Sequence, residues 1–298
     1  MKTFLENLKK ELEKRHFTKE DIEEILEDHQ EMIEEAKNDG LSDDDLIEKF
    51  GEPSKLAEDL SGSKSSNEVT EEVNTDDYKL LQSFPVLENN VDVIISLTSD
   101  DVECVAHDEE TFEVFYKKVK NINDYKLNFD GKVFSLEEKK KIGLFGFKVG
   151  SGQFIVKVPK ELNPNNLSIK IVSGEVALVQ VNAKDVSLRA VSGNLVVRQG
   201  QYASLDMSIV SGDAKVNNVD ISKDASINSV SGDITLSEVT AKNFFVKTVS
   251  GDCKGREFYP ENVRLKSISG DMKITNSDQS RIVNIISKKT LSGEIRIN

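Results

Sequence analysis

The stretch Ile-Asn-Ser-Val-Ser-Gly-Asp-Ile-Thr-Leu, residues 227–236, contains the element that decides the fold. From residue 173 onward its Ser-Gly pair occurs seven times, at intervals of 19, 19, 20, 19, 19 and 23 residues, and a further pair, Ser151-Gly152, lies 22 residues before the first of them. The seven pairs lie at 173–174, 192–193, 211–212, 231–232, 250–251, 269–270 and 292–293. Such regular spacing indicates a repeat architecture in which each unit stacks on the next.

Apolar residues hold fixed places relative to each glycine, and we expect four such columns to face the core. Two places after it stand Val176, Leu195, Ala214, Ile234, Cys253, Met272 and Ile295, and four places after it Leu178, Val197, Val216, Leu236, Gly255, Ile274 and Ile297. Two places before it stand Val172, Val191, Val210, Val230, Val249, Ile268 and Leu291, and five places before it Ile169, Leu188, Met207, Ile227, Val246 and Leu265. Each repeat is therefore predicted to be two short strands joined at a Val-Ser-Gly-Asp turn, where glycine permits a positive φ.

One repeat cannot fold alone. About six buried aliphatic side chains contribute on the order of 10–18 kcal/mol, whereas ordering a repeat costs about 1–2 kcal/mol for each residue. The repeats must share one continuous core. The predicted fold class is mainly β, a single-stranded β-solenoid of about seven 19-residue coils, preceded by a small all-α domain.

The first part of the chain has helical rather than strand periodicity. Thr3 can cap a helix with Leu8 and Leu12 on one face, and Ser42 can cap a later helix that begins with three aspartates. Beyond it, a Ser-rich stretch without apolar periodicity is typical of a flexible linker. We therefore predict a helical domain at 1–60, a linker at 61–77 and a β domain at 78–298, divided into an irregular cap at 78–165 and regular coils at 166–298.

Charge is concentrated at the N-terminus. Residues 1–60 hold 9 Lys and Arg against 20 Asp and Glu, so this segment has a net charge of -11. The net charge of the whole chain is -14. Phosphate backbones repel such a segment, so direct nucleic-acid binding is not expected. A basic protein surface is one candidate partner, and a simply solvated helical domain is the alternative.

The sequence offers no recognisable catalytic, metal-binding or cofactor-binding motif. Cys104 and Cys253 stand apart from any Cys/His cluster, and Cys253 falls in a core column. His16 and His29 lack metal-ligand spacing. The N-terminus has no signal-peptide core, and no stretch is apolar enough to span a membrane. We expect a non-enzymatic, cytoplasmic chain, and we expect any contact with a membrane to be peripheral.

The most unusual loop lies between Glu137 and Gly152, where a lysine cluster adjoins Leu144, Phe145 and Phe147. These three residues are the candidate contact site for a partner or for an anionic membrane, because exposed apolar side chains beside lysines suit such an interface. The alternative, which we favour, is that the aromatic rings fold back over the open end of the β core.

Acidic residues follow four successive glycines, at Asp213, Asp233, Asp252 and Asp271. Stacked coils would place them in one column, which could hold calcium or act as paired acids. Calcium-binding β-roll repeats have a shorter period and more glycine. Aspartate at such a turn commonly accepts hydrogen bonds from its own turn, so we expect a structural role.

Two family resemblances follow from these motifs. Phe4-Leu5 with Leu8 and Leu12, Gly40-Leu41-Ser42 and Phe50-Gly51-Glu52-Pro53 resemble the HAAS domain over about 60 residues. That resemblance implies an adaptor role and a PadR-like transcription regulator as a partner. The Val-Ser-Gly-Asp repeat, with Phe154 to Pro159 before it, resembles the bacterial "putative adhesin" or toastrack β-strand repeat family over 78–298, which implies binding or scaffolding without catalysis.

The leading hypothesis is therefore a non-catalytic bacterial interaction or scaffold protein, in envelope-stress signalling or adhesion. One alternative is a carbohydrate-binding or calcium-binding surface protein. Another is an anionic-membrane sensor that acts through the loop at 141–150.

Overall fold

A computed structural model of the chain describes residues 2–15, 22, 26, 75–139 and 152–297. The chain divides into two compact units, Met1–Glu71 and Glu72–Asn298.

The first unit contains helix α1 (Lys2–Lys14). Leu8 and Leu12 of this helix are buried, as the helical spacing predicts. The other predicted helices of residues 1–60 and the predicted linker up to residue 74 lie outside the described residues, as does the loop at 140–151.

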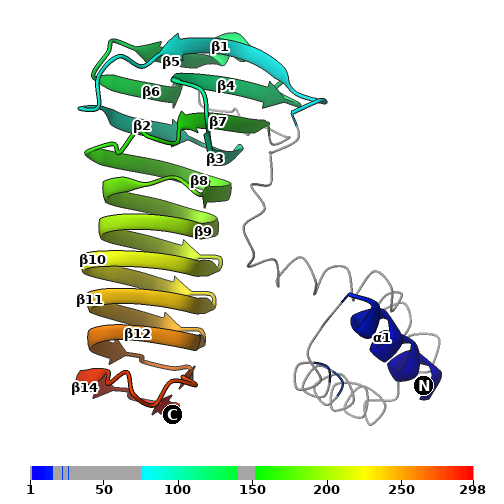
Figure 1. The fold of residues 1–298 in the computed structure, drawn as a ribbon, viewed down its shortest axis with the longest axis vertical. Helices are drawn as coiled ribbons and strands as arrows, with labels where there is room; N and C mark the ends of the chain where they lie inside the picture. The colour runs from blue at the N-terminus through cyan, green and yellow to red at the C-terminus, as the bar shows by residue number, and fades with distance from the viewer. Residues whose placement is uncertain (1, 16–21, 23–25, 27–74, 140–151, 298) are drawn as a thin grey trace, which may run out of the picture. The chain divides into compact units, whose positions relative to one another are not determined.

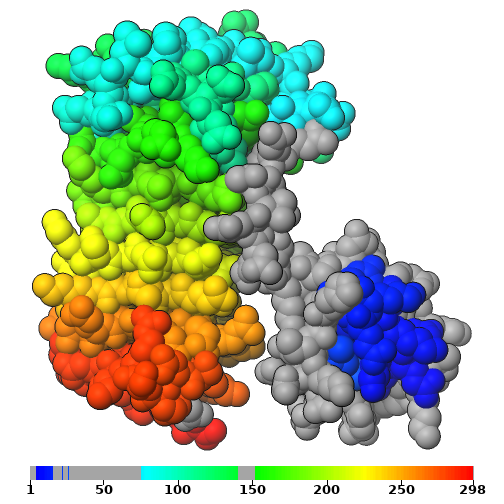
Figure 2. Space-filling view, viewed as in Figure 1, coloured from blue at the N-terminus to red at the C-terminus, as the bar shows by residue number. Residues whose placement is uncertain are grey.

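The second unit is a β-solenoid of about seven turns, which confirms the predicted fold class. Successive coils pair in parallel and one repeat apart, so that Lys215 pairs with Val196 on one side and with Thr235 on the other. Figure 1 shows the coils as stacked ribbons, and Figure 2 shows them as successive bands of colour. The coil strands are β8 (Asn166–Val179), β9 (Ala183–Ser211), β10 (Ala214–Ser231), β11 (Ile234–Ser250), β12 (Cys253–Lys266), β13 (Met272–Thr275), β14 (Asn284–Lys289) and β15 (Ile295–Ile297).

A mixed β cap covers the N-terminal end of the solenoid. A tight turn at Asp130-Gly131 joins two antiparallel strands. Phe84, Phe112, Phe129 and Phe134 pack together with ring centroids 4.6–6.3 Å apart. These rings close the end of the core. The cap strands are β1 (Lys79–Pro85), β2 (Asp92–Leu97), β3 (Asp101–His107), β4 (Thr111–Lys117), β5 (Tyr125–Phe129), β6 (Val133–Glu138) and β7 (Gln153–Pro159), with a short 3-10 helix at Ile122–Asp124.

The spatial order of the first coils differs from their order in the chain. Strand β3 pairs with β7 on one side and with β8 on the other, so an earlier segment is inserted between two later ones. Asp100 consequently occupies the place of a turn glycine, between Gly152 and Gly174. Gly152 is therefore in register with the repeat glycines, but its coil is not the immediate neighbour of the coil that contains Gly174.

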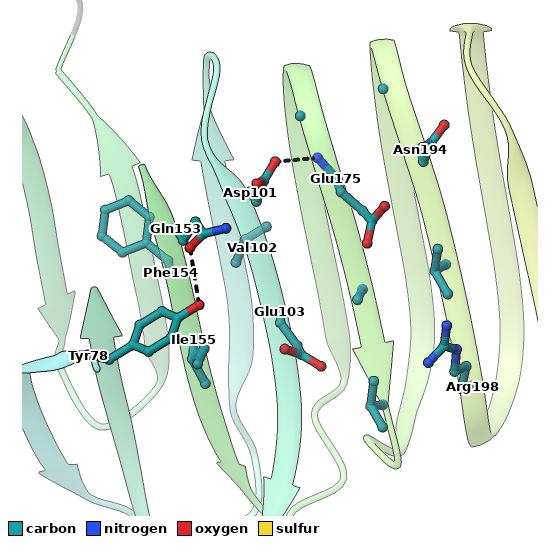
Figure 3. A pocket seen from close by; sticks show the side chains of 15 residues that line it. Tyr78, Asp101, Val102, Glu103, Gln153, Phe154, Ile155, Glu175, Asn194 and Arg198 are labelled. Carbon is teal, nitrogen blue, oxygen red and sulfur yellow. Dashed lines mark hydrogen bonds between the residues drawn. The ribbon is translucent and has the colours of Figure 1, made fainter. Parts of the chain in front are cut away.

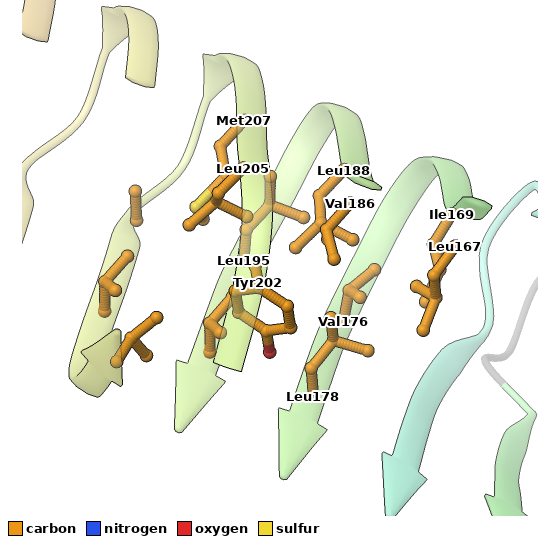
Figure 4. Close-up of a cluster of buried hydrophobic side chains, with 14 of the residues drawn as sticks. Leu167, Ile169, Val176, Leu178, Val186, Leu188, Leu195, Tyr202, Leu205 and Met207 are labelled. Carbon is orange, nitrogen blue, oxygen red and sulfur yellow. The ribbon is translucent and has the colours of Figure 1, made fainter. Parts of the chain in front are cut away.

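The core is a continuous stack of aliphatic columns inside the coils, and Figure 4 shows part of it around Leu167, Val176 and Leu195. Three of the four predicted columns are buried. They are the columns two and four places after each glycine, in which Ile297 is partly buried, and the column five places before it. The prediction for the column two places before the glycine is wrong. Val172, Val191, Val210, Val230 and Ile268 are 41–50% exposed.

The reason is the two-residue period of a strand. Positions two and five before the glycine are separated by an odd number of residues and must point to opposite faces. The position three before the glycine is buried instead, as in Ile171, Ile209 and Thr248.

Each coil also contains a third inward-facing segment that the sequence analysis did not assign. It follows a corner six places after the glycine, where Gln180, Gln199, Asn218, Glu238 and Glu257 all have φ between 50° and 59°. Val219 and Ile221 then turn inward and are buried. A coil therefore has three inward-facing segments rather than the predicted two strands.

Candidate functional site

The Ser-Gly turns stack directly on one another along the edge of the solenoid. Gly232 has φ +123°, and a Cβ there would lie 2.1 Å from the carbonyl oxygen of Gly212. The same approach, at 2.0–2.5 Å, occurs at Gly193, Gly212, Gly251, Gly270 and Gly293. The glycines are thus required both by the close stacking of the coils and, at all but Gly193, by the positive φ.

The acidic column beside these turns is a ladder of hydrogen bonds between coils. The backbone N–H of Asp233 donates to Oδ1 of Asp213 at 3.0 Å, that of Asp252 donates to Asp233 at 2.9 Å, and that of Asp271 donates to Asp252 at 2.8 Å. Asp101 and Asn194 accept the equivalent bond higher in the stack. The expectation that each carboxylate bonds its own turn is corrected, because its acceptor oxygen faces the next coil.

This ladder explains the acidic column without a ligand. Each carboxylate or amide supplies one acceptor to a backbone donor, which an asparagine does as well as an aspartate. Within the described residues, no group of three or more His, Cys, Asp or Glu side chains is arranged to hold a metal ion.

The two cysteines are buried in the core. Burial raises the pKa of Cys104 well above its ordinary value, with a smaller contribution from the charge of Glu103. Burial, followed by the charges of Asp233 and Asp252, raises the pKa of Cys253 to about 12. Both are therefore protonated at neutral pH and unsuited to act as nucleophiles.

One hollow lies on the outer face where the cap meets the first coils, with a volume of about 580 Å³ (Figure 3). Asp101, Glu175 and Asn194 line it near the turns, and Glu103 and Arg198 lie farther along the strands. The hydroxyl of Tyr78 donates to Oε1 of Gln153 at 3.4 Å, and burial raises the pKa of this tyrosine. The acceptor of Asp101 is already used by the backbone N–H of Glu175, at 2.9 Å.

A second hollow, of about 440 Å³, lies on another face of the coils, around Phe245, Arg264 and Ile286. Phe245 and Arg264 are register partners on β11 and β12. Ile286 is the extra residue of a β-bulge between β12 and β14, and 48% of it is exposed.

The exposed aliphatic column lies on the same face as Phe245 and Arg264 of this second hollow, because these two residues and the valines all lie an even number of places before a glycine. We call this surface the valine face. It comprises Val172, Val191, Val210, Val230, Val249 and Ile268, the column of Lys170, Arg189, Lys247, Lys266 and Lys289 beside them, and the hollow around Phe245. The sequence contained the signal for it, since a correct strand parity places these residues outward.

The loop residues Leu144, Phe145 and Phe147, which the sequence singled out, lie outside the described residues, as do His16 and His29. The partner or membrane contact proposed for Leu144, Phe145 and Phe147 therefore remains a prediction.

Comparison with protein families decides the class of the chain. The model of the family named Toastrack DUF4097 matches residues 54–229 and 222–298. The chain belongs to this family. A second model, HAAS, matches residues 3–59. Both resemblances inferred from the sequence are thereby confirmed.

Solved structures match the chain at low sequence identity. A "putative adhesin" from Bacteroides fragilis is 18% identical, with a TM-score of 0.53 over 74% of this chain and 97% of its own. A "putative adhesin" from Parabacteroides distasonis is 18% identical, with a TM-score of 0.41 over 73% and 98%. A "putative lipid binding protein" from the same species is 12% identical, with a TM-score of 0.33 over 74% and 98%. A search of curated proteins found no match.

The solved structures reported above carry names of adhesins or of a binding protein rather than of enzymes. Across the described parts of the present toastrack chain, no helix is long and apolar enough to cross a membrane.

Proposed function

We propose that this toastrack protein is a non-catalytic interaction scaffold, in which a helical N-terminal adaptor and a rigid solenoid each bind a protein partner. One observation carries the proposal. The most regular side chains, including the glycines and the acidic column, are used in stacking the coils. The chemical variety that remains lies in the outward columns, which form long surfaces rather than a closed site.

For the N-terminal segment we propose a basic protein partner, and a PadR-like regulator is the specific candidate that the HAAS resemblance suggests. The net charge of -11 in residues 1–60 would attract such a surface and repel nucleic acid. Envelope-stress signalling is the pathway we propose for this pair, and adhesion is the alternative use of the solenoid.

The test is cross-linking of the full chain at its natural level in the cells that produce it, followed by mass spectrometry. We expect a basic protein at a stoichiometric level, and we expect it to be lost when Asp43, Asp44 and Asp45 are replaced by Asn. The matched control replaces Asp213, Asp233 and Asp252 by Asn, which removes the same charge from the solenoid. Recovery of no specific protein, or equal loss in the control, would contradict the proposal.

The membrane-sensor alternative depends on Phe145 and Phe147. It predicts that the full chain sediments with vesicles containing anionic lipid, and that replacing both residues by Ser abolishes sedimentation without lowering stability. Lower stability in that variant would instead indicate that the two rings cover the core.

A further inference from the structure

The valine face has an apolar column that stacking of the coils does not require. Val172, Val191, Val210 and Val230 lie on successive coils and are 46–50% exposed. Val249 follows on the next coil and is partly buried, and Ile268 on the coil after that is 41% exposed. Thr would satisfy the same β propensity without exposing apolar surface. A contiguous apolar row of this kind marks an interaction surface.

Positive charge lies beside this column. Lys247 and Lys266 are register partners, and Lys289 follows on the next coil. No ion pair engages these three lysines or Arg264 among the described residues. Arg189 differs, because it pairs with Asp206. On these coils the face therefore carries cationic side chains outside any ion pair within the described part of the chain, while the carboxylate of Asp224 lines the neighbouring hollow.

The hollow of about 440 Å³ supplies an anchor point next to these charges. Phe245 is half-buried in it, and Ile286 stands beside it on its bulge. A hollow with an aromatic wall and neighbouring cations fits an apolar side chain flanked by carboxylates.

The amide side chains of the hollow are already hydrogen-bonded within the protein. Nδ2 of Asn243 donates to Oδ1 of Asp224 at 2.8 Å, and Nδ2 of Asn262 donates to Oδ1 of Asn243 at 3.0 Å. These amides are therefore poorly placed to bind the hydroxyls of a glycan. A membrane fits less well too, because valines on a flat sheet do not project into the acyl region as an interfacial helix does.

We propose that the valine face binds an acidic segment of a partner protein, with an apolar side chain of that segment in the hollow beside Phe245 and its carboxylates on Lys247, Arg264 and Lys266. This inference rests on the proposed function and names the partner chemistry for the solenoid. It concerns a different surface from the acidic N-terminal segment.

The test uses the full chain and a short fluorescein-labelled peptide of repeating Glu-Glu-Leu sequence, with binding followed by fluorescence anisotropy. We expect binding that weakens as salt rises. Peptides of Glu-Glu-Ser or Lys-Lys-Leu should bind at least about tenfold more weakly, because one lacks the anchor and the other repels the lysines.

Two variants locate the binding. Phe245→Thr, and separately Lys247→Gln with Lys266→Gln, should each weaken binding by about tenfold or more. The matched control, Lys254→Gln with Lys273→Gln, removes the same charge from another face, at register partners on β12 and β13, and should bind as the parent does. Circular dichroism and thermal melting confirm that each variant is folded.

The proposal is overturned if the parent chain does not prefer the Glu-Glu-Leu peptide, or if the control loses binding as the test variants do. Loss of binding to anionic vesicles or to a glycan array in the same variants would assign the face to another partner class and also contradict it. If cross-linking recovers the basic partner while the peptide fails, only the inference about this face falls.

Discussion

Gly232 shows the strictness of the turn at the scale of one residue. Its positive φ and the 2.1 Å approach to Gly212 leave no space for a side chain, since both the conformation and the neighbouring backbone are fixed. The repeating Ser-Gly is therefore a packing requirement of the stack.

Gly232→Ala should lower the free energy of unfolding by about 3 kcal/mol or more, because backbone strain adds to a clash with the neighbouring backbone. Gly131→Ala is the matched control, since Gly131 also has a positive φ but nothing lies within 4 Å of its Cβ position. It should cost only about 1–2 kcal/mol. Urea denaturation measures both, and equal losses would show that the coils do not stack at the glycines.

Two substitutions of Asp233 distinguish the effect of charge from the effect of hydrogen bonding in the acidic column. Asp233→Asn keeps the acceptor for the backbone N–H of Asp252, as Asn194 does for Asp213, and should change stability by less than about 0.5 kcal/mol. Asp233→Ala leaves that donor without its partner and should cost about 1–2 kcal/mol. A large loss in the Asn variant, or a response to added calcium in the parent, would show that the charge itself has a role.

At the scale of the element, the strand before each turn has opposite faces with opposite requirements. Ile227 is fully buried, whereas Val230 is 46% exposed. Ile227→Thr should lower stability by about 2–4 kcal/mol, because it buries a hydroxyl and leaves a gap. Val230→Thr should lie within about 0.5 kcal/mol of the parent. Thermal melting of the two variants checks the assignment, and the reverse order of stability would restore the inward valine column.

One corner of the solenoid, at Glu257, gives the fold a pH dependence. The hydroxyl of Tyr259 donates to Oε2 of Glu257 at 2.6 Å, and the backbone N–H of Ser277 donates to Oε1 at 2.9 Å. The hydrogen bond from Tyr259 holds the pKa of Glu257 below its ordinary value of 4.5, against the opposing effect of burial. The carboxylate therefore stabilises the fold above that ordinary pKa, and the contribution is lost as pH falls through the folded-state pKa.

Glu257→Gln should accordingly be less stable than the parent at neutral pH, and the difference should shrink as the pH falls below 4.5. Glutamine suits this corner, since Gln180 and Gln199 occupy it in other coils with the same positive φ. Urea denaturation at neutral and acid pH gives the comparison. A difference that is constant with pH would remove Glu257 as a titrating contributor.

How much could be predicted also differs between elements. The spacing of Ser-Gly predicted the stack, and the columns after each glycine predicted one wall of the core. The third inward segment of each coil was not predicted, because its residues, such as Gly200 and Ala241, vary too much in size to show a clear period. The placement of β3 between β7 and β8 was not predicted, because this pairing joins segments that are far apart in the chain and local periodicity does not report it.

The candidate surface was predictable only in part. The valine column was recognised in the sequence, but it was predicted to face the core and was therefore not considered as a binding surface. The hollow beside Phe245 depends on the bulge at Ile286, whose register the sequence does not reveal.

At the scale of the molecule, the solenoid unit joins these elements in columns that run along its axis. One outward column passes in register through Glu103, Ala177, Val196, Lys215, Thr235, Lys254, Lys273 and Arg296. Each step adds about 4.8 Å, the spacing between neighbouring strands. The valine face has its continuous form only if this stacking is uninterrupted.

Distances between spin labels along this column test that stacking most directly. With Cys104 and Cys253 replaced by Val, pairs of labelled cysteines at Glu103 and Thr235, Glu103 and Lys273, and Glu103 and Arg296 are measured by double electron–electron resonance. Four, six and seven steps predict backbone separations of about 19, 29 and 34 Å. Distances that increase in this proportion support the stacked solenoid and its continuous faces, whereas a Glu103–Arg296 distance no longer than the Glu103–Thr235 distance would contradict them.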